Sequence, residues 1–420
     1  MRASHFVYAG SALLVSAVAL AFIAGQTQAN TRGSHVPQFR VDANWPKLPL
    51  PSAGDFGTPL VLSTSTGKPK PWVTGEVAGT CTDSRDHVFT VNRGNLVAPE
   101  DVEAVSSPTV IEFNQAGNVV NAWNTTARQA QIHGCFVDYQ DNIWIAGNGD
   151  GVVQKWTHDG KTLLLQIGTL GVCDNPPANT CGNSGANPAA NQSKTLLNEP
   201  ANVWVDPERD PVNGKRGSVY IADGYGNHRV VVFDAQGVFL RQWGGVAGTV
   251  NNPLTDFPAD FGAGDGGHPH CVVGGSDGLM YVCDRQDDRI QVFTKTGTLM
   301  RIIPVVPGTG ATLGIGGAPG LGTAGSAWDL QFSNDAFQMF MFEVDGGNEQ
   351  MHIMDRALGA ILASFGQPGH QAGTQFTFLH SVAKDSKGNL YTGETINGRR
   401  VQKFTRVDGD NNQGDDNDSQ

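Results

Sequence analysis

Residues 203–207 read VWVDP and residues 218–244 read SVYIADGYGNHRVVVFDAQGVFLRQWG, and this stretch decides the fold. Apolar and polar residues alternate over short runs, and turns rich in Gly, Asn and Asp separate the runs. This pattern is typical of half-buried β-strands. Four such strands follow one another here, and four consecutive antiparallel strands make one blade of a β-propeller.

The same phrase recurs along the chain, as a repeat architecture predicts. The copies lie at 87–123, 142–168, 202–243, 282–303, 328–366 and 389–405. The last copy lacks a fourth strand, and Gln38–Ala43 (QFRVDA) is available to supply it. We therefore predict an all-β, six-bladed propeller of NHL-type repeats whose ring is closed by an N-terminal strand, which leaves no open sheet edge. Within this repeat pattern, Asp223, His228 and Arg229 are interpreted as residues of blade structure.

The two ends of the chain are not expected to belong to the propeller. Arg2 and His5 precede an apolar run, Ala12–Ala24, and the small-residue pattern Thr27–Ala29 follows it. This layout predicts a signal peptide over 1–29; the alternative, a membrane anchor, needs a longer run. The propeller is expected over 30–407, and the acidic segment 408–420, which has no apolar residue, is expected to be disordered. The mature protein should be secreted or periplasmic.

Composition narrows the classes of partner. The chain has 54 glycines, only 16% charged residues and a formal net charge of −12. Abundant glycine suits many tight turns between short strands, and the acidic balance argues against nucleic acid or an anionic membrane as partner. We expect a monomer that acts on a small molecule or a peptide.

Six cysteines in an exported chain suggest disulfides. Cys173 and Cys181 close a short loop and are the pair expected first. Metal binding by cysteine is the alternative, but no C-x-x-C spacing occurs.

Histidines recur at the start of the innermost strand of alternate blades. They are His133, His270 and His380, whereas the intervening blades have small residues there, Gly79, Ala201 and Ala327. In a six-fold ring, alternate blades are a third of a turn apart, so the three imidazoles should converge on the axis. Three inward imidazoles with an open fourth position are typical of a catalytic zinc site. Copper or iron also accepts such ligands, and each histidine taken alone would be read as a packed residue.

Three further polar residues should lie on the same face, in loops that follow the second strand of a blade. These residues are Arg93, Tyr225 and Arg285. Arginine suits a carboxylate, and a tyrosine near a divalent cation can serve as a base. Taken singly, each is more often a solvated loop residue, and for Arg285 the two interpretations are about equal.

These residues, in this order, resemble peptidyl-α-hydroxyglycine α-amidating lyase, the lyase half of the peptide C-terminal amidating enzyme. The resemblance rests on NRG at Asn92–Gly94, His133, SVYIADGY at Ser218–Tyr225, PHC at Pro269–Cys271, CDRQDDRIQVF from Cys283, and His380. It implies cleavage of the N–Cα bond of a hydroxylated glycine, which releases an amide and glyoxylate.

The resemblance also implies roles for the candidate residues. His133, His270 and His380 would bind zinc, Tyr225 would accept the proton of the substrate hydroxyl, Arg93 would hold the substrate carboxylate, and Arg285 would support them. The family's structural calcium is doubtful here, because Ser381 stands where the family has an aspartate. The family's disulfide positions are not matched either, and Cys81 with Cys135 and Cys271 with Cys283 are candidate replacements.

Two other functions remain open from the sequence. A non-catalytic NHL propeller would bind a protein or peptide across its loop face, and its histidines would be structural. A metal-dependent hydrolase or lactonase would use the same axial site, but it would need carboxylate ligands, and the axial residues here are all histidine.

Overall fold

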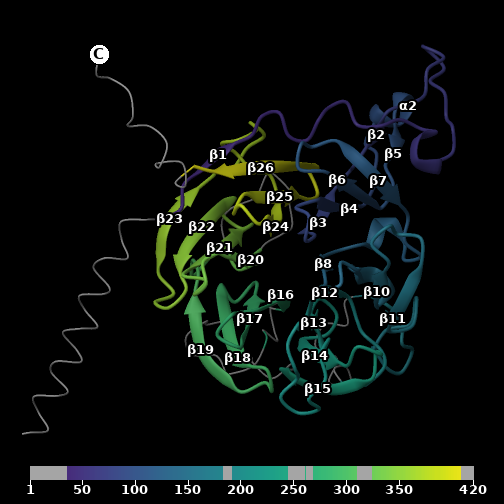
Figure 1. Ribbon diagram of the computed structural model, residues 1–420. Coiled ribbons are helices and arrows are strands. Elements are labelled where there is room, and N and C mark those ends of the chain that lie inside the picture. Colours follow the sequence, from purple (N-terminus) through teal and green to yellow (C-terminus); the bar gives the residue numbers. More distant parts are fainter. Residues whose placement is uncertain (1–35, 183–191, 245–260, 262–267, 310–323, 408–420) are drawn as a thin grey trace, which may run out of the picture. The chain divides into compact units, whose positions relative to one another are not determined.

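Six four-stranded antiparallel sheets surround a central axis in the computed structural model (Figure 1). The structure describes residues 36–182, 192–244, 261, 268–309 and 324–407, and the propeller is the unit Phe39–Arg406. The six-bladed, all-β prediction is confirmed. The predicted signal peptide and acidic tail lie outside the described residues.

Each blade consists of four strands, and the first strand is the innermost. Blade 1 contains β3 (Val77–Thr82), β4 (Val88–Asn92), β6 (Val110–Phe113) and β7 (Val119–Trp123). Blade 2 contains β8 (Cys135–Val137), β9 (Ile143–Gly147), β10 (Val152–Trp156) and β11 (Leu163–Ile167). Blade 3 contains β12 (Pro200–Val205), β13 (Val219–Asp223), β14 (Arg229–Phe233) and β15 (Phe239–Gly244).

The other three blades repeat this order. Blade 4 contains β16 (Pro269–Gly274), β17 (Leu279–Asp284), β18 (Arg289–Thr294) and β19 (Leu299–Pro304). Blade 5 contains β20 (Asp329–Phe332), β21 (Phe340–Asp345), β22 (Gln350–Asp355) and β23 (Ile361–Phe365). Blade 6 contains β24 (Leu379–Lys384), β25 (Leu390–Glu394), β26 (Arg400–Arg406) and, from the other end of the chain, β1 (Phe39–Val41).

The ring is closed by an N-terminal strand, as predicted. β1 pairs antiparallel with β26, with Phe39 opposite Arg406 and Val41 opposite Phe404. The outermost strand of blade 6 therefore comes from a segment that precedes blade 1, and the two ends of the repeat array are joined within one sheet. The short elements outside the blades are the parallel pair β2 (Trp72–Val73) and β5 (Val105–Ser106), helix α2 (Glu100–Glu103) and the 3-10 turns Asp55–Gly57, Gln129–Gln131 and Asn148–Asp150.

The hydrophobic core lies between the faces of neighbouring blades. One cluster joins Phe89 of blade 1 to Ile145 of blade 2, and the next joins Trp144 of blade 2 to Val231 of blade 3. Adjacent residues of one strand point to opposite faces, so Trp144 and Ile145 belong to different clusters. Each blade is thus buried on both sides, which explains strands such as VVVF in β14.

Buried ion pairs link the second and third strands of individual blades. Nε of Arg229 donates to Asp223 at 2.9 Å, and Nε of Arg289 donates to Asp284 at 2.7 Å, with all four side chains fully buried. Removing one partner of such a pair would leave an uncompensated buried charge. The interpretation of Asp223 and Arg229 as blade-structure residues agrees with these contacts.

The six cysteines form three disulfides, Cys81–Cys135, Cys173–Cys181 and Cys271–Cys283. The first joins the innermost strands of blades 1 and 2, and the last joins paired positions of β16 and β17. Such pairing is typical of an oxidising compartment. Among the described residues, no helix is long and apolar enough to cross a membrane.

The Cys81–Cys135 and Cys173–Cys181 disulfides close loops of different length, and this difference gives a prediction about stability. Cys81 and Cys135 are 54 residues apart in sequence, whereas Cys173 and Cys181 are 8 apart. Because the longer crosslink removes more entropy from the unfolded chain, the Cys81→Ala/Cys135→Ala variant should lose about 4 kcal/mol of unfolding free energy and Cys173→Ala/Cys181→Ala about 2.5 kcal/mol. Denaturant unfolding of both variants measures this order, and the reverse order would contradict it.

Candidate metal centre

The site begins with an extra residue in the first strand of several blades. In blade 4, Pro269 pairs with Asp284 and Cys271 pairs with Cys283, so His270 is an additional residue between them. His380 of blade 6 lies at the same kind of irregularity between Leu379 and Ser381. Such a β-bulge re-aims the side chain of the extra residue. The bulges therefore direct both imidazoles out of the regular alternation of the sheet.

His133 occupies the corresponding position just before β8. Its backbone N–H donates to the carbonyl of Ala146, and the N–H of Ala146 donates to the carbonyl of Gly134. The ladder between the first two strands of blade 2 therefore extends past Cys135, where β8 begins. Glycine is required next to the histidine, because a Cβ at Gly134 would lie 2.7 Å from the carbonyl oxygen of Ala201 in the next blade.

The three imidazoles meet at the axis, as predicted. The ring of His133 lies 4.6 Å from that of His380 and 5.0 Å from that of His270, and the latter two are 4.9 Å apart between centroids. Each residue is 2–4% exposed. One ring nitrogen of each lies within 4.8 Å of the corresponding nitrogen of the other two.

Backbone carbonyls fix the tautomer of every ring. Since a carbonyl only accepts, each Nδ1 donates to it, and each Nε2 is left with its lone pair. The partners are Ala201 for His133 at 2.7 Å, Trp328 for His270 at 2.6 Å and Ala78 for His380 at 2.8 Å. Each histidine on an even-numbered blade is thus held by the next odd-numbered blade.

The rings are neutral as well as oriented. Burial holds the pKa of each histidine well below 6.5, and the neighbouring imidazole and arginine charges lower it further. Metal ions bind deprotonated imidazole, and the other ring nitrogen of a metal-bound histidine usually donates to a carbonyl or carboxylate. The residues present therefore fit a divalent cation held by three Nε2 atoms with an open position.

The intervening blades need a correction. Ala201 is the bulge residue of blade 3, but the equivalent residues of blades 1 and 5 are Ala78 and Trp328, each one position away from Gly79 and Ala327. Trp328 is not small: its ring lies 5.5 Å from His270 and 5.6 Å from His380. At the axis, the carbonyl oxygens of Ala78, Ala201 and Trp328, rather than their side chains, accept the hydrogen bonds of the histidines.

Tyr225, in the loop after β13, contacts two of the histidines, and Arg285, after β17, contacts Tyr225. The Tyr225 hydroxyl lies 2.9 Å from Nε2 of His270 and 3.1 Å from Nε2 of His133, and Arg285 Nη1 donates to it at 2.9 Å. Burial raises the pKa of Tyr225, whereas the charges of Arg285 and Arg93 lower it. The Arg285 guanidinium also lies 3.7 Å above the ring of Trp328.

Arg93 lies at the same face but is bound to an acid that the sequence analysis did not identify. Its Nη1 donates to Glu76 at 2.6 Å and its Nε to the carbonyl of Ile132 at 3.1 Å. Asn95 and Thr395 hold the same carboxylate. Among the described residues, Nη2 of Arg93 has no hydrogen-bond partner, so one edge of the guanidinium remains for a ligand.

Two aromatic neighbours were also missed. His268 lies just before β16 and stacks on Tyr225 with 4.1 Å between centroids. Trp328 lies just before β20, at the start of the most degraded repeat, where no sequence signal marks its position.

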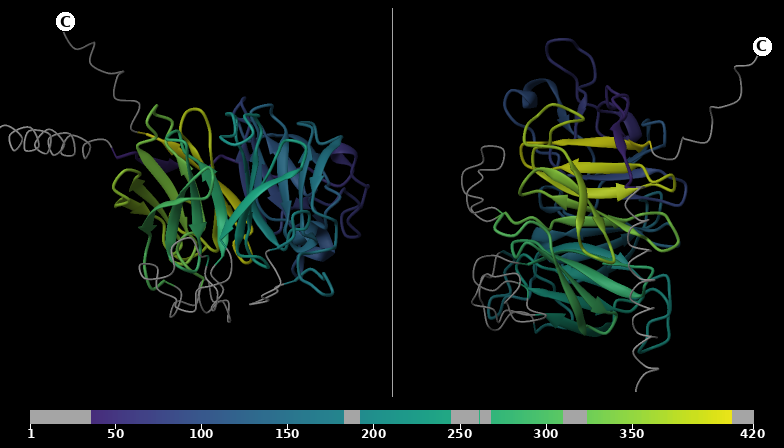
Figure 2. Two further views of the ribbon diagram at one scale, coloured as in Figure 1. Left: turned by 90° about the horizontal axis from the view of Figure 1, so that it is seen from below. Right: turned by 90° about the vertical axis from the view of Figure 1, so that its left-hand side faces the viewer.

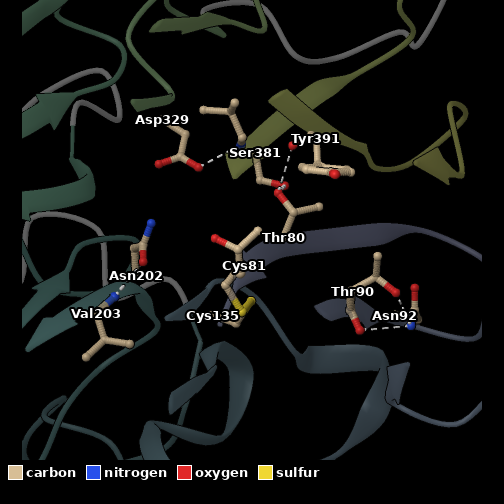
Figure 3. The surroundings of a disulfide bond; sticks show 12 residues. Thr80, Cys81, Thr90, Asn92, Cys135, Asn202, Val203, Asp329, Ser381 and Tyr391 are labelled. Carbon is tan, nitrogen blue, oxygen red and sulfur yellow. Dashed lines mark hydrogen bonds between the residues drawn. A yellow bond between two sulfur atoms is a disulfide. The ribbon is translucent and has the colours of Figure 1, made fainter. Parts of the chain in front are cut away.

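A cavity of about 190 Å³ follows the histidines along the axis. Figure 3 shows Thr80, Asn202, Asp329 and Ser381 in this region, beside the Cys81–Cys135 disulfide. Ser381 contacts Thr80 through its hydroxyl, and Asp329, whose pKa burial raises to about 7, accepts from the backbone of Val382 and Leu330. A carboxylate is thus present near Ser381, though from another blade. This arrangement does not test the expectation that calcium is doubtful here.

Comparison with known proteins supports the resemblance. No family model matches the chain. Peptidyl-glycine alpha-amidating monooxygenase B of Xenopus laevis is 24% identical over 79% of this chain and 34% of that protein. NHL repeat-containing protein 3 of Mus musculus is 26% identical over 80% of this chain and 75% of that protein. A probable peptidyl-alpha-hydroxyglycine alpha-amidating lyase of Caenorhabditis elegans is 22% identical over 52% and 56%, respectively.

The chain thus spans about a third of the Xenopus protein and just over half of the Caenorhabditis protein. With the six-bladed architecture, these relatives confirm an NHL-type propeller that resembles the amidating lyases.

The hydrogen bonds predict the state of the imidazoles in the metal-free protein. At about pH 6, where an unperturbed histidine is mostly protonated, His133, His270 and His380 should remain neutral with the proton on Nδ1. Nitrogen NMR of the labelled imidazole side chains measures this, with the urea-unfolded protein as control. As pH falls below 6.5, only the unfolded chain takes up these protons, so stability should decrease. Imidazolium signals from the three residues at this pH would contradict the assignment.

Proposed function

We propose that this protein is an exported, metal-dependent carbon–nitrogen lyase that cleaves the N–Cα bond of an N-acyl-α-hydroxyglycine and releases an amide and glyoxylate. One observation carries the proposal: three neutral imidazoles meet on the axis, and a tyrosine hydroxyl held by an arginine lies against them. The name of the Caenorhabditis relative, an alpha-amidating lyase, supports the reaction class.

His133, His270 and His380 would hold the cation, and zinc is the ion that best fits three imidazoles with an open position. When bound, such a cation supplies Lewis-acid chemistry to a coordinated oxygen.

Tyr225 is the residue placed to accept the proton of the substrate hydroxyl. Its hydroxyl oxygen receives a hydrogen bond from Arg285, which favours the phenolate, and Arg93 adds a second positive charge. These charges oppose the effect of burial, which favours the neutral phenol. Burial outweighs the two charges, so the pKa of Tyr225 is raised in the metal-free protein. A cation bound beside the hydroxyl would lower this pKa toward the range that a general base needs.

The protons and electrons of the reaction balance because Tyr225 accepts one proton and then returns it. With Tyr225 as the phenolate, the hydroxyl proton passes to its oxygen and the O–H electron pair becomes the new carbonyl bond of glyoxylate. The N–Cα bond breaks and its pair goes to nitrogen, which takes the proton back from Tyr225 to give the neutral amide. No other reactant is needed.

The two arginines are the candidates for holding the substrate carboxylate. Nη2 of Arg93 is left for the substrate carboxylate, because Glu76 accepts from Nη1 and the carbonyl of Ile132 accepts from Nε. Arg285 is fixed by the carbonyl of Ala324, which accepts from Nε at 2.8 Å, and by its position above Trp328. Rigid guanidinium groups lose little freedom when they bind a carboxylate.

A second candidate is a non-catalytic propeller that binds a protein or peptide on its loop face. The similarity to NHL repeat-containing protein 3, which covers 75% of that protein, favours it. In this case the protein would release no glyoxylate, whether or not metal is bound.

Substitution of Tyr225 separates the two candidates. Tyr225→Phe retains the ring stacked on His268 and removes only the hydroxyl, so the variant should keep its metal and its fold. The rate of glyoxylate release from an N-acyl-α-hydroxyglycine should fall by about 10²–10⁴-fold, the usual contribution of a general base.

The matched control is His270→Ala, which should lose the axial metal and the activity. Elemental analysis should find about one metal per chain more in the wild type and in Tyr225→Phe than in His270→Ala. A wild-type protein that holds zinc at the axis and releases no glyoxylate would refute the lyase and leave the binding propeller.

A further inference from the structure

A second group of metal-ligating side chains lies at the opposite end of blades 1 and 2. The histidine centre is at the end where the first strands begin, whereas this group surrounds the turns where the first and third strands end. Figure 2 shows the blades from the side, with their strands running between these two faces. It contains Asp83 and His87 from the turn between β3 and β4, Glu112 from β6, and His158 from the turn after β10. Asp83 and Glu112 have side chains 0% and 5% exposed.

One part of this group is ordinary blade structure. Asp83 accepts hydrogen bonds through Oδ1 from the backbone of Arg85 and His87, and Asp138 does the same in blade 2 for Gln140 and Asn142. An aspartate in this turn therefore stabilises the turn itself. The contact made by the second carboxylate oxygen, Oδ2, differs between the two blades.

The difference is a reversal of charge at one register position. In blade 2, Oδ2 of Asp138 lies 3.0 Å from Nζ of Lys155, which is paired with Trp144. In blade 1, the residue paired with the equivalent Phe89 is Glu112. Blade 1 thus buries two carboxylates where blade 2 buries an ion pair, and a positive charge is needed between them.

Two imidazoles complete the group. Nε2 of His158 lies 2.8 Å from Oδ2 of Asp83, and Nδ1 of His87 lies 2.6 Å from Oε1 of Glu112. Ligand atoms of Asp83, Glu112 and His158 all lie within 4.8 Å of one another. One imidazole and two carboxylates are a ligand set for zinc and neighbouring divalent transition metals.

Arg85 marks where a cation would sit. Its Nη2 lies 2.7 Å from Nε2 of His158, 3.2 Å from Oδ2 of Asp83 and 3.8 Å from Oε1 of Glu112. The Arg85 side chain is 56% exposed, so it can turn out to solvent without leaving a cavity in the core. The guanidinium acts as a replaceable counter-charge at the mouth of the group.

We propose that Asp83, Glu112 and His158 form a second binding site for a divalent transition-metal cation, with His87 as the hydrogen-bond partner that orients Glu112. The cation would replace Arg85 and link blade 1 to blade 2, the same two blades that the Cys81–Cys135 disulfide joins. This site is independent of the proposed lyase reaction, since its residues lie at the other end of the blades.

Zinc binding by the full chain in a His270→Ala background tests the proposal, because that substitution disables the axial centre. Equilibrium dialysis against Zn²⁺ with elemental analysis should find about one zinc per chain. Adding Glu112→Lys, which copies the Lys155 pair of blade 2 and should fold, should abolish that binding. Zinc retained by the Glu112→Lys protein, or no zinc in either protein, would overturn the proposal.

Two further variants separate a metal site from an ion-pair network. Arg85→Ala should tighten zinc binding, because it removes the competing charge, and zinc should restore thermal stability lost by the substitution. His87→Ala should weaken zinc binding by about 10–100-fold, as expected when the partner of a ligand is removed. If Arg85→Ala destabilises the protein and zinc neither binds nor restores it, the group is a network of ion pairs only.

Discussion

Three hydrogen bonds between blades determine what the axis can do. They run from Nδ1 of His133, His270 and His380 to backbone carbonyls of the next blade, and they decide which nitrogen of each ring faces the centre. β-bulges supply the aimed side chains of His270 and His380 and the exposed carbonyls of Ala78 and Ala201. Alternation around the ring follows directly, since each even blade contributes a ligand and each odd blade orients it.

This arrangement requires a rigid ring, and the rest of the structure provides it. β1 closes the last blade, buried clusters fill the spaces between blades, and Cys81–Cys135 joins the first two innermost strands. Loops on one face of such a scaffold then hold Tyr225 against the imidazoles and Arg285 against Tyr225. Burial keeps the rings neutral, so the same packing that stabilises the ring prepares it for a cation.

Much of this could be predicted from the sequence because blade periodicity and the alternate histidines are local patterns. The closing strand and the Cys173–Cys181 bridge were predictable for the same reason. The positions of Ala78 and Trp328 were not, since a bulge in blade 1 shifts the register by one residue and the degraded fifth repeat leaves no clear signal. Glu76 was missed because it precedes β3 and its contact with Arg93, which follows β4, depends on the conformation of the loop residues there. The charge reversal at Glu112 becomes visible only when β6 and β10 are aligned by their strand pairing.

The central claim is that the axis of this propeller is a three-histidine metal centre. A crystal structure of the zinc-loaded protein, with anomalous data collected on both sides of the zinc absorption edge, tests it most directly. The account predicts an anomalous peak at the axis, bonded to Nε2 of His133, His270 and His380 at about 2.0–2.1 Å. An axis without such a peak, with the three imidazoles hydrogen-bonded as in the metal-free protein, would contradict it.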